Sequence, residues 1–214
     1  MLWAGIDVGE LADVDLPERW VLKPNHSSGH VHFGEGPVRS ADLVALRAAT
    51  RGWLREHLAS VEGEWGYARA RRCLVVEECL PGAASLTEYK FFLFSGQPHA
   101  VLVHTDRFGR HSRTMYNPDW RHLHARFDVP PGPSLPEGPQ TSPPAQLPQM
   151  LRLARRLSEP FDFIRVDLYA DDKAVWFGEL TSYPTGGWGQ LRPRSFDLEL
   201  GRAWRLPSRA EAAG

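Results

Sequence analysis

Apolar residues in the first third of the chain form short runs that predict strands, together with one stretch at helical spacing. Residues 20–22 make a short apolar strand, residues 30–33 a second, and residues 73–76 a continuous one. Ser40 is a suitable N-cap, and the apolar positions that follow it predict a helix over residues 41–58. This part of the chain therefore combines a small sheet with one long helix.

Two hairpins are predicted farther along the chain. Residues 88–94 and 99–105 alternate on either side of a turn at residues 95–98, where a glycine and a proline occur. Residues 161–169 and 174–180 form a second pair around a short acidic turn. Antiparallel pairing is the expected arrangement for both hairpins, because each connection is short.

The remaining segments complete a mixed α+β pattern. Residues 129–148 are rich in proline, with glycine, serine and glutamine, and predict an extended surface loop. Pro148 suits the first turn of a helix that reaches about residue 158, and a last helix is expected over residues 196–204. No internal repeat is evident, so the order of elements predicts an α+β fold with helices packed on antiparallel hairpins.

Composition narrows the class of protein. The chain has 214 residues, of which 42% are hydrophobic and 24% charged, with a formal net charge of −1. This balance is typical of a globular protein and argues against nucleic-acid binding. Two cysteines do not make a disulfide framework, and the sequence predicts neither a signal peptide nor a membrane span. A cytoplasmic protein without membrane partners is therefore expected. The nine histidines show no zinc-site spacing, so none is assigned a role.

The second hairpin carries charge on one face of a strand. Alternation places Arg165 and Asp167 on the face opposite the apolar residues, and the turn position places Glu179 roughly across from Asp167, with Thr181 on the same face. Two carboxylates and a hydroxyl supply the oxygen ligands that Mg²⁺ prefers, and an arginine suits a phosphate or an anionic intermediate. An ion pair on a solvated sheet face is the alternative interpretation.

Two other segments carry weaker signals for a nucleotide. Lys23 ends the first strand, and the small and polar residues 25–29 after it can wrap phosphates with backbone N–H groups, although they match neither a P-loop nor a GxGxxG motif. An ordinary turn is the alternative. Glu77 and Glu78 end another buried strand, where a carboxylate or the backbone near Leu80 can meet an adenine ring. A solvated strand end explains this pair equally well.

The order of these segments resembles the TupA-like ATP-grasp family over about residues 18–201. The motifs that carry the resemblance lie at residues 20–29, 76–80, 88–94, 106–107, 116–120, 163–169 and 177–184. The resemblance implies two α+β lobes with antiparallel sheets that clasp ATP, here residues 1–80 and 81–214. Only about 20 residues precede Lys23, so the N-terminal domain common in the superfamily is expected to be short or missing, and a homodimer or a partner subunit could complete that side.

The resemblance also implies roles for individual residues. The nucleotide-binding residues would be Lys23 for the phosphates, Ser27, Ser28 and Gly29 in a lid loop, Glu77 with the backbone from Glu78 to Leu80 for adenine, and Glu88 for the ribose hydroxyls. Asp167 and Glu179 would bind Mg²⁺, with Thr181 where many relatives have asparagine. Arg165 would steady the transferred phosphoryl group, and Lys90 would lie near it.

The activity that the resemblance implies is ATP- and Mg²⁺-dependent joining of a carboxylate to an amine through an acyl phosphate, on a small amino-acid or peptide substrate. Two alternatives remain within nucleotide-binding proteins: phosphorylation of a hydroxyl, and a regulatory subunit without turnover. A globular interaction module whose motifs match by accident is a third.

Overall fold

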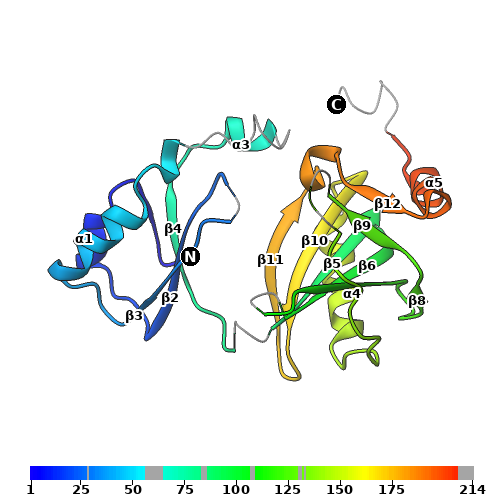
Figure 1. The fold of residues 1–214 in the computed structure, drawn as a ribbon, viewed down its shortest axis with the longest axis horizontal. Helices are drawn as coiled ribbons and strands as arrows, with labels where there is room; N and C mark the ends of the chain where they lie inside the picture. Colours follow the sequence, from blue (N-terminus) through cyan, green and yellow to red (C-terminus); the bar gives the residue numbers. More distant parts are fainter. Residues whose placement is uncertain are drawn as a thin grey trace. The chain divides into compact units, whose positions relative to one another are not determined.

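The structure is a computed structural model that describes residues 1–27, 29–55, 65–82, 86–106, 109–129, 132 and 134–206. The chain divides into two compact units, Met1–Ala83 and Ala84–Gly214 (Figure 1). Each unit has its own antiparallel sheet and its own hydrophobic core.

The first unit is built on a four-stranded sheet in the order β1-β4-β2-β3. Its strands are β1 (Trp3–Gly5), β2 (Arg19–Pro24), β3 (His32–Glu35) and β4 (Leu74–Glu78). Its helical segments are η1 (Val8–Asp13), α1 (Ser40–Ala49), η2 (Trp53–Arg55) and α3 (Trp65–Arg69). The short strands β1 and β3 lie at the two edges of this sheet.

Alternation along β2 separates the two faces of this sheet. Trp20 and Leu22 are buried and pack in one cluster with Leu46 of α1. Lys23 is half-exposed on the other face, where its register neighbour on β4 is Val75. The first unit therefore covers one sheet face with α1 and leaves a charged side chain on the opposite face.

Helix α1 is shorter than its apolar pattern predicts. It ends at Ala49, and Thr50 at its C-cap donates its hydroxyl to the carbonyl of Leu46 at 2.8 Å. Gly52 follows with φ of +96°, a backbone conformation that suits glycine and ends the helix. The prediction of a helix to residue 58 was therefore wrong at least as far as residue 55, and residues 56–58 lie outside the described part of the chain.

The second unit is built on a six-stranded sheet in the order β11-β10-β5-β6-β7-β8. These strands are β5 (Thr87–Phe94), β6 (Gln97–Thr105), β7 (Ser112–Tyr116), β8 (His122–Leu123), β10 (Phe163–Ala170) and β11 (Val175–Thr181). A separate two-stranded sheet pairs β9 (Arg126–Asp128) with β12 (Gln190–Arg192). The helical segments are α4 (Leu147–Ser158), η3 (Pro184–Gly187) and α5 (Arg194–Ala203). Both predicted hairpins are present as β5–β6 and β10–β11, each antiparallel.

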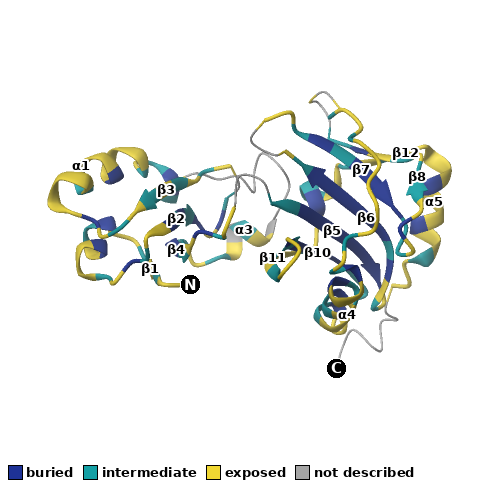
Figure 2. Cartoon of the chain, turned by 90° about the horizontal axis from the view of Figure 1, so that it is seen from below, coloured by how far each residue is buried: buried dark blue, intermediate teal, exposed yellow. Residues whose placement is uncertain are grey.

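The two faces of the six-stranded sheet belong to different cores. Phe91 and Leu93 are fully buried in a cluster that includes Met150 of α4. Phe92 and Phe94, which alternate with them on β5, are buried in another cluster that contains Phe196 and Leu200 of α5. Figure 2 shows the buried residues running along β5, β6 and β10. The sheet is therefore covered on one face by α4 and on part of the other by α5.

The proline-rich segment has mostly irregular backbone through residues 134–146 and is tied to the sheet at more than one point. Glu137 forms an isolated parallel β-bridge with Arg113 of β7, and a second attachment involves Thr141. The indole of Trp120 donates to the carbonyl oxygen of Thr141 at 2.9 Å, and the Thr141 N–H donates to the Tyr116 hydroxyl at 2.8 Å. The rings of Tyr116 and Trp120 stack at 4.4 Å. These aromatic residues hold the segment ahead of α4, which begins at Leu147.

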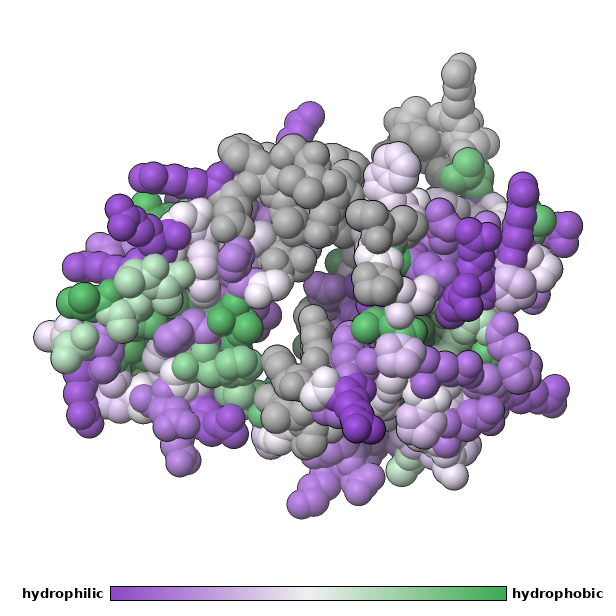
Figure 3. All heavy atoms as spheres, in the orientation of Figure 1, coloured by the Kyte–Doolittle hydropathy of each residue, from purple (hydrophilic) through white to green (hydrophobic). Residues whose placement is uncertain are grey.

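Hydrophilic residues cover much of the visible surface of both units, with smaller groups of apolar residues between them (Figure 3). Among the described residues, no helix is both long and apolar enough to cross a membrane.

Candidate functional site

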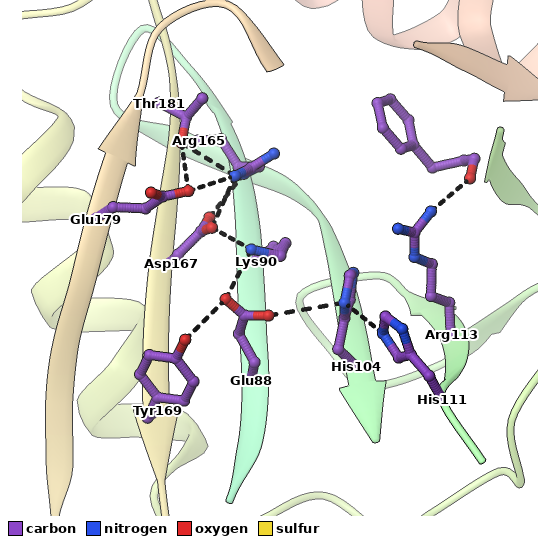
Figure 4. A network of polar contacts seen from close by, with 11 residues as sticks. Glu88, Lys90, His104, His111, Arg113, Arg165, Asp167, Tyr169, Glu179 and Thr181 are labelled. Atoms are coloured by element: carbon purple, nitrogen blue, oxygen red, sulfur yellow. Dashed lines mark hydrogen bonds and ion pairs between the residues drawn. The ribbon is translucent and has the colours of Figure 1, made fainter. Parts of the chain in front are cut away.

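Polar residues gather on the α5-facing side of the six-stranded sheet, toward one end of its central strands (Figure 4). Register sets them side by side: Asp167 pairs with Lys90 on one neighbouring strand and with Glu179 on the other. Arg165 pairs with Thr181 one step along the same face. The predicted position of Glu179 across from Asp167 is confirmed, but it depends on a register shift of one residue between Asp167 and Leu168. Unbroken pairing from the turn would place Gly178 opposite Asp167, so a β-bulge brings the two carboxylates together.

Asp167 is the centre of this cluster. Its side chain is completely buried, and both of its oxygens accept hydrogen bonds from cations. Arg165 donates from Nε to Oδ1 at 2.7 Å and from Nη2 to Oδ2 at 2.8 Å, while Lys90 Nζ also donates to Oδ2. This forked contact fixes the plane of the guanidinium group on the sheet.

Arg165 reaches β11 with the same nitrogen. Nη2 also donates to Glu179 Oε1 at 2.8 Å and to Thr181 Oγ1 at 3.0 Å. Within the described part of the chain, Nη1 has no hydrogen-bond or ion-pair partner. It is also not one of the fully buried polar atoms, so a ligand can reach it. Arg165 is therefore held by two of its nitrogens and retains one donor group for an anionic ligand.

Lys90 links Asp167 to a second buried carboxylate. Its Nζ donates to Glu88 Oε1 at 2.8 Å, and the Tyr169 hydroxyl donates to the same oxygen at 3.2 Å. Glu88 is 4% exposed, so a ribose contact at this residue would compete with Lys90 and Tyr169. Lys90 and Glu88 thus belong to one network with the predicted metal ligands.

Two histidines that the sequence left unassigned also belong to this network. His104 of β6 faces Glu88 in register, and its Nδ1 lies 3.6 Å from Glu88 Oε2. His111 Nε2 lies 3.0 Å from the same Nδ1. His104 faces Glu88 only because the register of β5 and β6 shifts by one residue at Phe92, so pairing extended from the turn would not have found it. His111 lies in an irregular segment and gives no sequence signal either.

The fit of this cluster to Mg²⁺ rests on Glu179. Its side chain is 53% exposed, and its Oε1 is engaged by Arg165 and Thr181, whereas Oε2 has no partner among the described residues. Three carboxylates, Glu88, Asp167 and Glu179, face two cations, so the cluster carries one net negative charge when all three carboxylates are ionised and the histidines are neutral.

The protein ligands alone do not complete a metal site. Among the described residues, no group of three histidine, cysteine, aspartate or glutamate side chains is placed to hold a metal ion. Asp167 can coordinate a cation only if Lys90 or Arg165 turns away from it. The arrangement therefore fits a cation bound by Glu179 and completed by phosphate oxygens, which is a common mode for Mg²⁺.

Burial and the two cations act differently on the two carboxylates. Burial raises the pKa of the Asp167 carboxyl above its ordinary value, although Lys90 and Arg165 pull it downward. Burial also raises the pKa of Glu179, but Lys90 and Arg165 outweigh it, and the pKa lies below its ordinary value. The difference follows from exposure, because Asp167 is completely buried and Glu179 is half-exposed. Glu179 is thus the carboxylate that more readily stays ionised.

In the first unit, two of the predicted nucleotide-binding residues pair with each other. Lys23 Nζ lies 2.6 Å from Glu77 Oε2, and both side chains are about two-fifths exposed. Glu78 is exposed, and the N–H of Cys79 donates to the carbonyl oxygen of Arg19 at 3.0 Å. Leu80 makes no hydrogen bond to any described residue, so its backbone groups remain available to a ligand.

The loop after β2 is anchored at its start. Asn25 donates from Nδ2 to the carbonyl oxygen of Arg71 at 2.9 Å, and its Oδ1 accepts from the N–H of Cys73 at 2.9 Å. Farther along, the Ser27 hydroxyl oxygen is buried without a partner among the described residues, and Gly29 has a φ of +86°. Ser28 lies outside the described residues. The root of the predicted lid loop is therefore fixed by side-chain and backbone bonds to the segment that leads into β4.

Comparison with known proteins agrees with this fold. The family profile described as TupA-like ATPgrasp matches residues 3–205, nearly the whole chain. The structure and this match define an α+β protein of the ATP-grasp superfamily. Within that superfamily, the chain belongs to the TupA-like ATP-grasp family.

Solved structures show more distant similarity. Two crystal structures of D-alanine–D-alanine ligase from Bacillus anthracis, one complexed with ATP, are 14% and 15% identical to the chain, each with a TM-score of 0.42. Each match covers 85% of this chain but 49% and 47% of the ligase chains, so this chain spans about half their length. Among curated proteins, none matches the chain.

Proposed function

We propose that this protein is an ATP- and Mg²⁺-dependent carboxylate–amine ligase that acts on a small amino-acid or peptide substrate through an acyl phosphate. Family membership supports the use of ATP. The main support for the reaction is the geometry of Arg165. Asp167 holds its guanidinium group by two hydrogen bonds, while Nη1 has no partner among the described residues. Such a fixed cation suits the negative charge that develops when a phosphoryl group moves to a carboxylate.

The remaining cluster residues have supporting roles in this proposal. Glu179 would hold Mg²⁺ through Oε2, and the bound ion would neutralise charge on the phosphates. Asp167 would position Arg165 and Lys90. It would also bind Mg²⁺ when the side chain of Arg165 or Lys90 leaves it to contact the ATP phosphates. Thr181 fixes Glu179 Oε1 at 3.0 Å, which leaves Oε2 directed to the ion. Lys90 supplies a second cation beside the transferred group.

In the first unit, Lys23 would exchange its contact with Glu77 for the ATP phosphates. Glu77 and the backbone at Leu80 would then meet the adenine ring. The substrate carboxylate oxygen attacks the terminal phosphorus and ADP leaves. An amine then attacks the carbonyl carbon, phosphate departs, and the amine loses a proton to give the amide.

Phosphate release tests this proposal directly. The protein is incubated with MgATP and a panel of amino acids and dipeptides, offered singly and in pairs, and products are identified by mass spectrometry. We expect phosphate and ADP in equal amounts, with a product whose mass equals the two substrates less one water. A stable phosphorylated hydroxyl product would instead support a kinase. No phosphate release across the panel, with ATP bound, would favour a nucleotide-binding subunit without turnover.

A further inference from the structure

A cavity of about 450 Å³ lies in the second unit, between the six-stranded sheet and the segments that cover it. Its floor is formed by Phe92 and Phe94 of β5 and Phe163 of β10. Helix α5 contributes Leu198, and Trp204 lines the cavity directly after the end of that helix. A volume of this size is typical of a small-molecule pocket, and the aromatic floor suits an apolar group.

The cavity continues the face that carries the polar cluster. Phe92 is the register neighbour of Arg165 across β5 and β10, and Phe163 lies two residues from Arg165 on the same strand and face. Opposed side chains in an antiparallel pair lie about 5 Å apart at Cβ, and positions two residues apart lie about 7 Å apart along a strand. Arg165 therefore stands at the boundary between charged and aromatic surface.

The chain that follows β11 leads from the cluster into the cavity wall. Thr181 contacts Arg165 and Glu179, and the next residues, Ser182 and Tyr183, line the cavity. The polar cluster and the cavity are thus joined both across the sheet and along the chain.

We propose that this cavity binds the aromatic or large aliphatic side chain of the acid substrate, whose carboxylate lies against Arg165. This inference rests on the proposed ligase function for the fate of that carboxylate. Nη1 of Arg165 supplies the charged contact for the substrate carboxylate. The substrate's apolar side chain packs on the phenylalanine floor beside it and is removed from water there. A small amino acid such as alanine would leave the cavity unfilled.

Gly201 allows the cavity to be filled without disturbing the core. It lines the cavity from α5, and a Cβ built there meets no heavy atom within 4 Å. Leucine also favours the helix more than glycine does, so Gly201→Leu is expected to fold. Glu199→Leu is the matched control, because Glu199 lies on the same helix, is exposed, and does not line the cavity.

The first experiment measures binding of 3-phenylpropionate and propionate by titration calorimetry without ATP. We expect 3-phenylpropionate to bind about 100-fold more tightly, because a phenyl group exceeds the single methylene that is worth about 10- to 200-fold in an apolar pocket. Gly201→Leu should abolish this preference and Glu199→Leu should retain it. The uncharged 3-phenylpropionamide should bind at least about 10-fold more weakly, since it lacks the charged partner of Arg165.

A second experiment compares phosphate release from MgATP with phenylalanine and with alanine in the same three proteins. We expect kcat/KM to favour phenylalanine by about 100-fold in the wild type and the control only. Equal use of alanine, unchanged by Gly201→Leu, would overturn the cavity assignment and leave the ligase proposal standing. Binding that depends on Gly201 and the carboxylate, without phosphate release from any acid, would support the cavity assignment and contradict the ligase. Absence of 3-phenylpropionate binding would overturn the inference.

Discussion

Replacing Asp167 by alanine is expected to lower the free energy of unfolding of the second unit by about 3–5 kcal/mol. The substitution leaves Arg165 and Lys90, both nearly buried, without the carboxylate that receives three of their hydrogen bonds. Glu179 already accepts a hydrogen bond from Arg165, and Glu88 already accepts one from Lys90, so neither carboxylate can take the place of Asp167. Urea denaturation followed by circular dichroism measures the change.

Glu179→Ala is the matched comparison for this prediction. It removes another carboxylate from Arg165, but that side chain is 53% exposed, and a solvent-accessible pair contributes only about 0–1 kcal/mol. An equal decrease in the free energy of unfolding in the two variants would contradict the conclusion that Asp167 is the centre of the buried network.

Replacing Arg165 by lysine is expected to lower kcat for phosphate release by about 10²- to 10³-fold. Lysine keeps the positive charge but cannot reproduce the forked contact with Asp167 or leave a separate donor directed at the substrate. The rate is measured at saturating MgATP with the best substrate of the panel.

Arg126→Lys controls for the general effect of this exchange. Arg126 is an exposed arginine on β9 that pairs with Asp128 at 3.0 Å, away from the cluster. Its activity should equal that of the wild type. A similar rate in Arg165→Lys would show that the forked geometry does not contribute to the reaction.

The alternation of residues along the second hairpin predicted that Arg165, Asp167 and Glu179 share one face of the sheet. Both hairpins form where the pattern predicts them, and Asp167 and Glu179 lie beside each other as expected, although a register shift between Asp167 and Leu168 is needed to pair them. The same rule joins Lys90 to Glu88 on one face of β5, which the bond between them confirms. Period-two patterns place residues on the correct face within a strand, but they do not reveal the one-residue register shift that each hairpin contains.

Features that depend on contacts between distant segments were not predicted. Asp167 binds Lys90 across 77 positions of sequence, and the cavity forms only where α5 packs over the phenylalanines of β5. Helix α1 ends early because Gly52 takes a positive φ, which the apolar spacing does not reveal. The short strands β1, β8, β9 and β12 were also missed, since two or three residues carry no detectable periodicity.

We propose that the chain holds a magnesium-dependent ATP site that includes Glu179. Thermal unfolding with ATP, with and without MgCl₂, tests it in the wild type and in Glu179→Gln, which keeps the shape of the half-exposed side chain. Ligand at about 100 times its Kd stabilises a native protein by about 2.7 kcal/mol. We expect a rise in Tm with MgATP that exceeds the rise with ATP alone, and loss of the magnesium-dependent part in Glu179→Gln. No rise with MgATP in the wild type, or an equal rise in Glu179→Gln, would contradict a magnesium-dependent ATP site at Glu179.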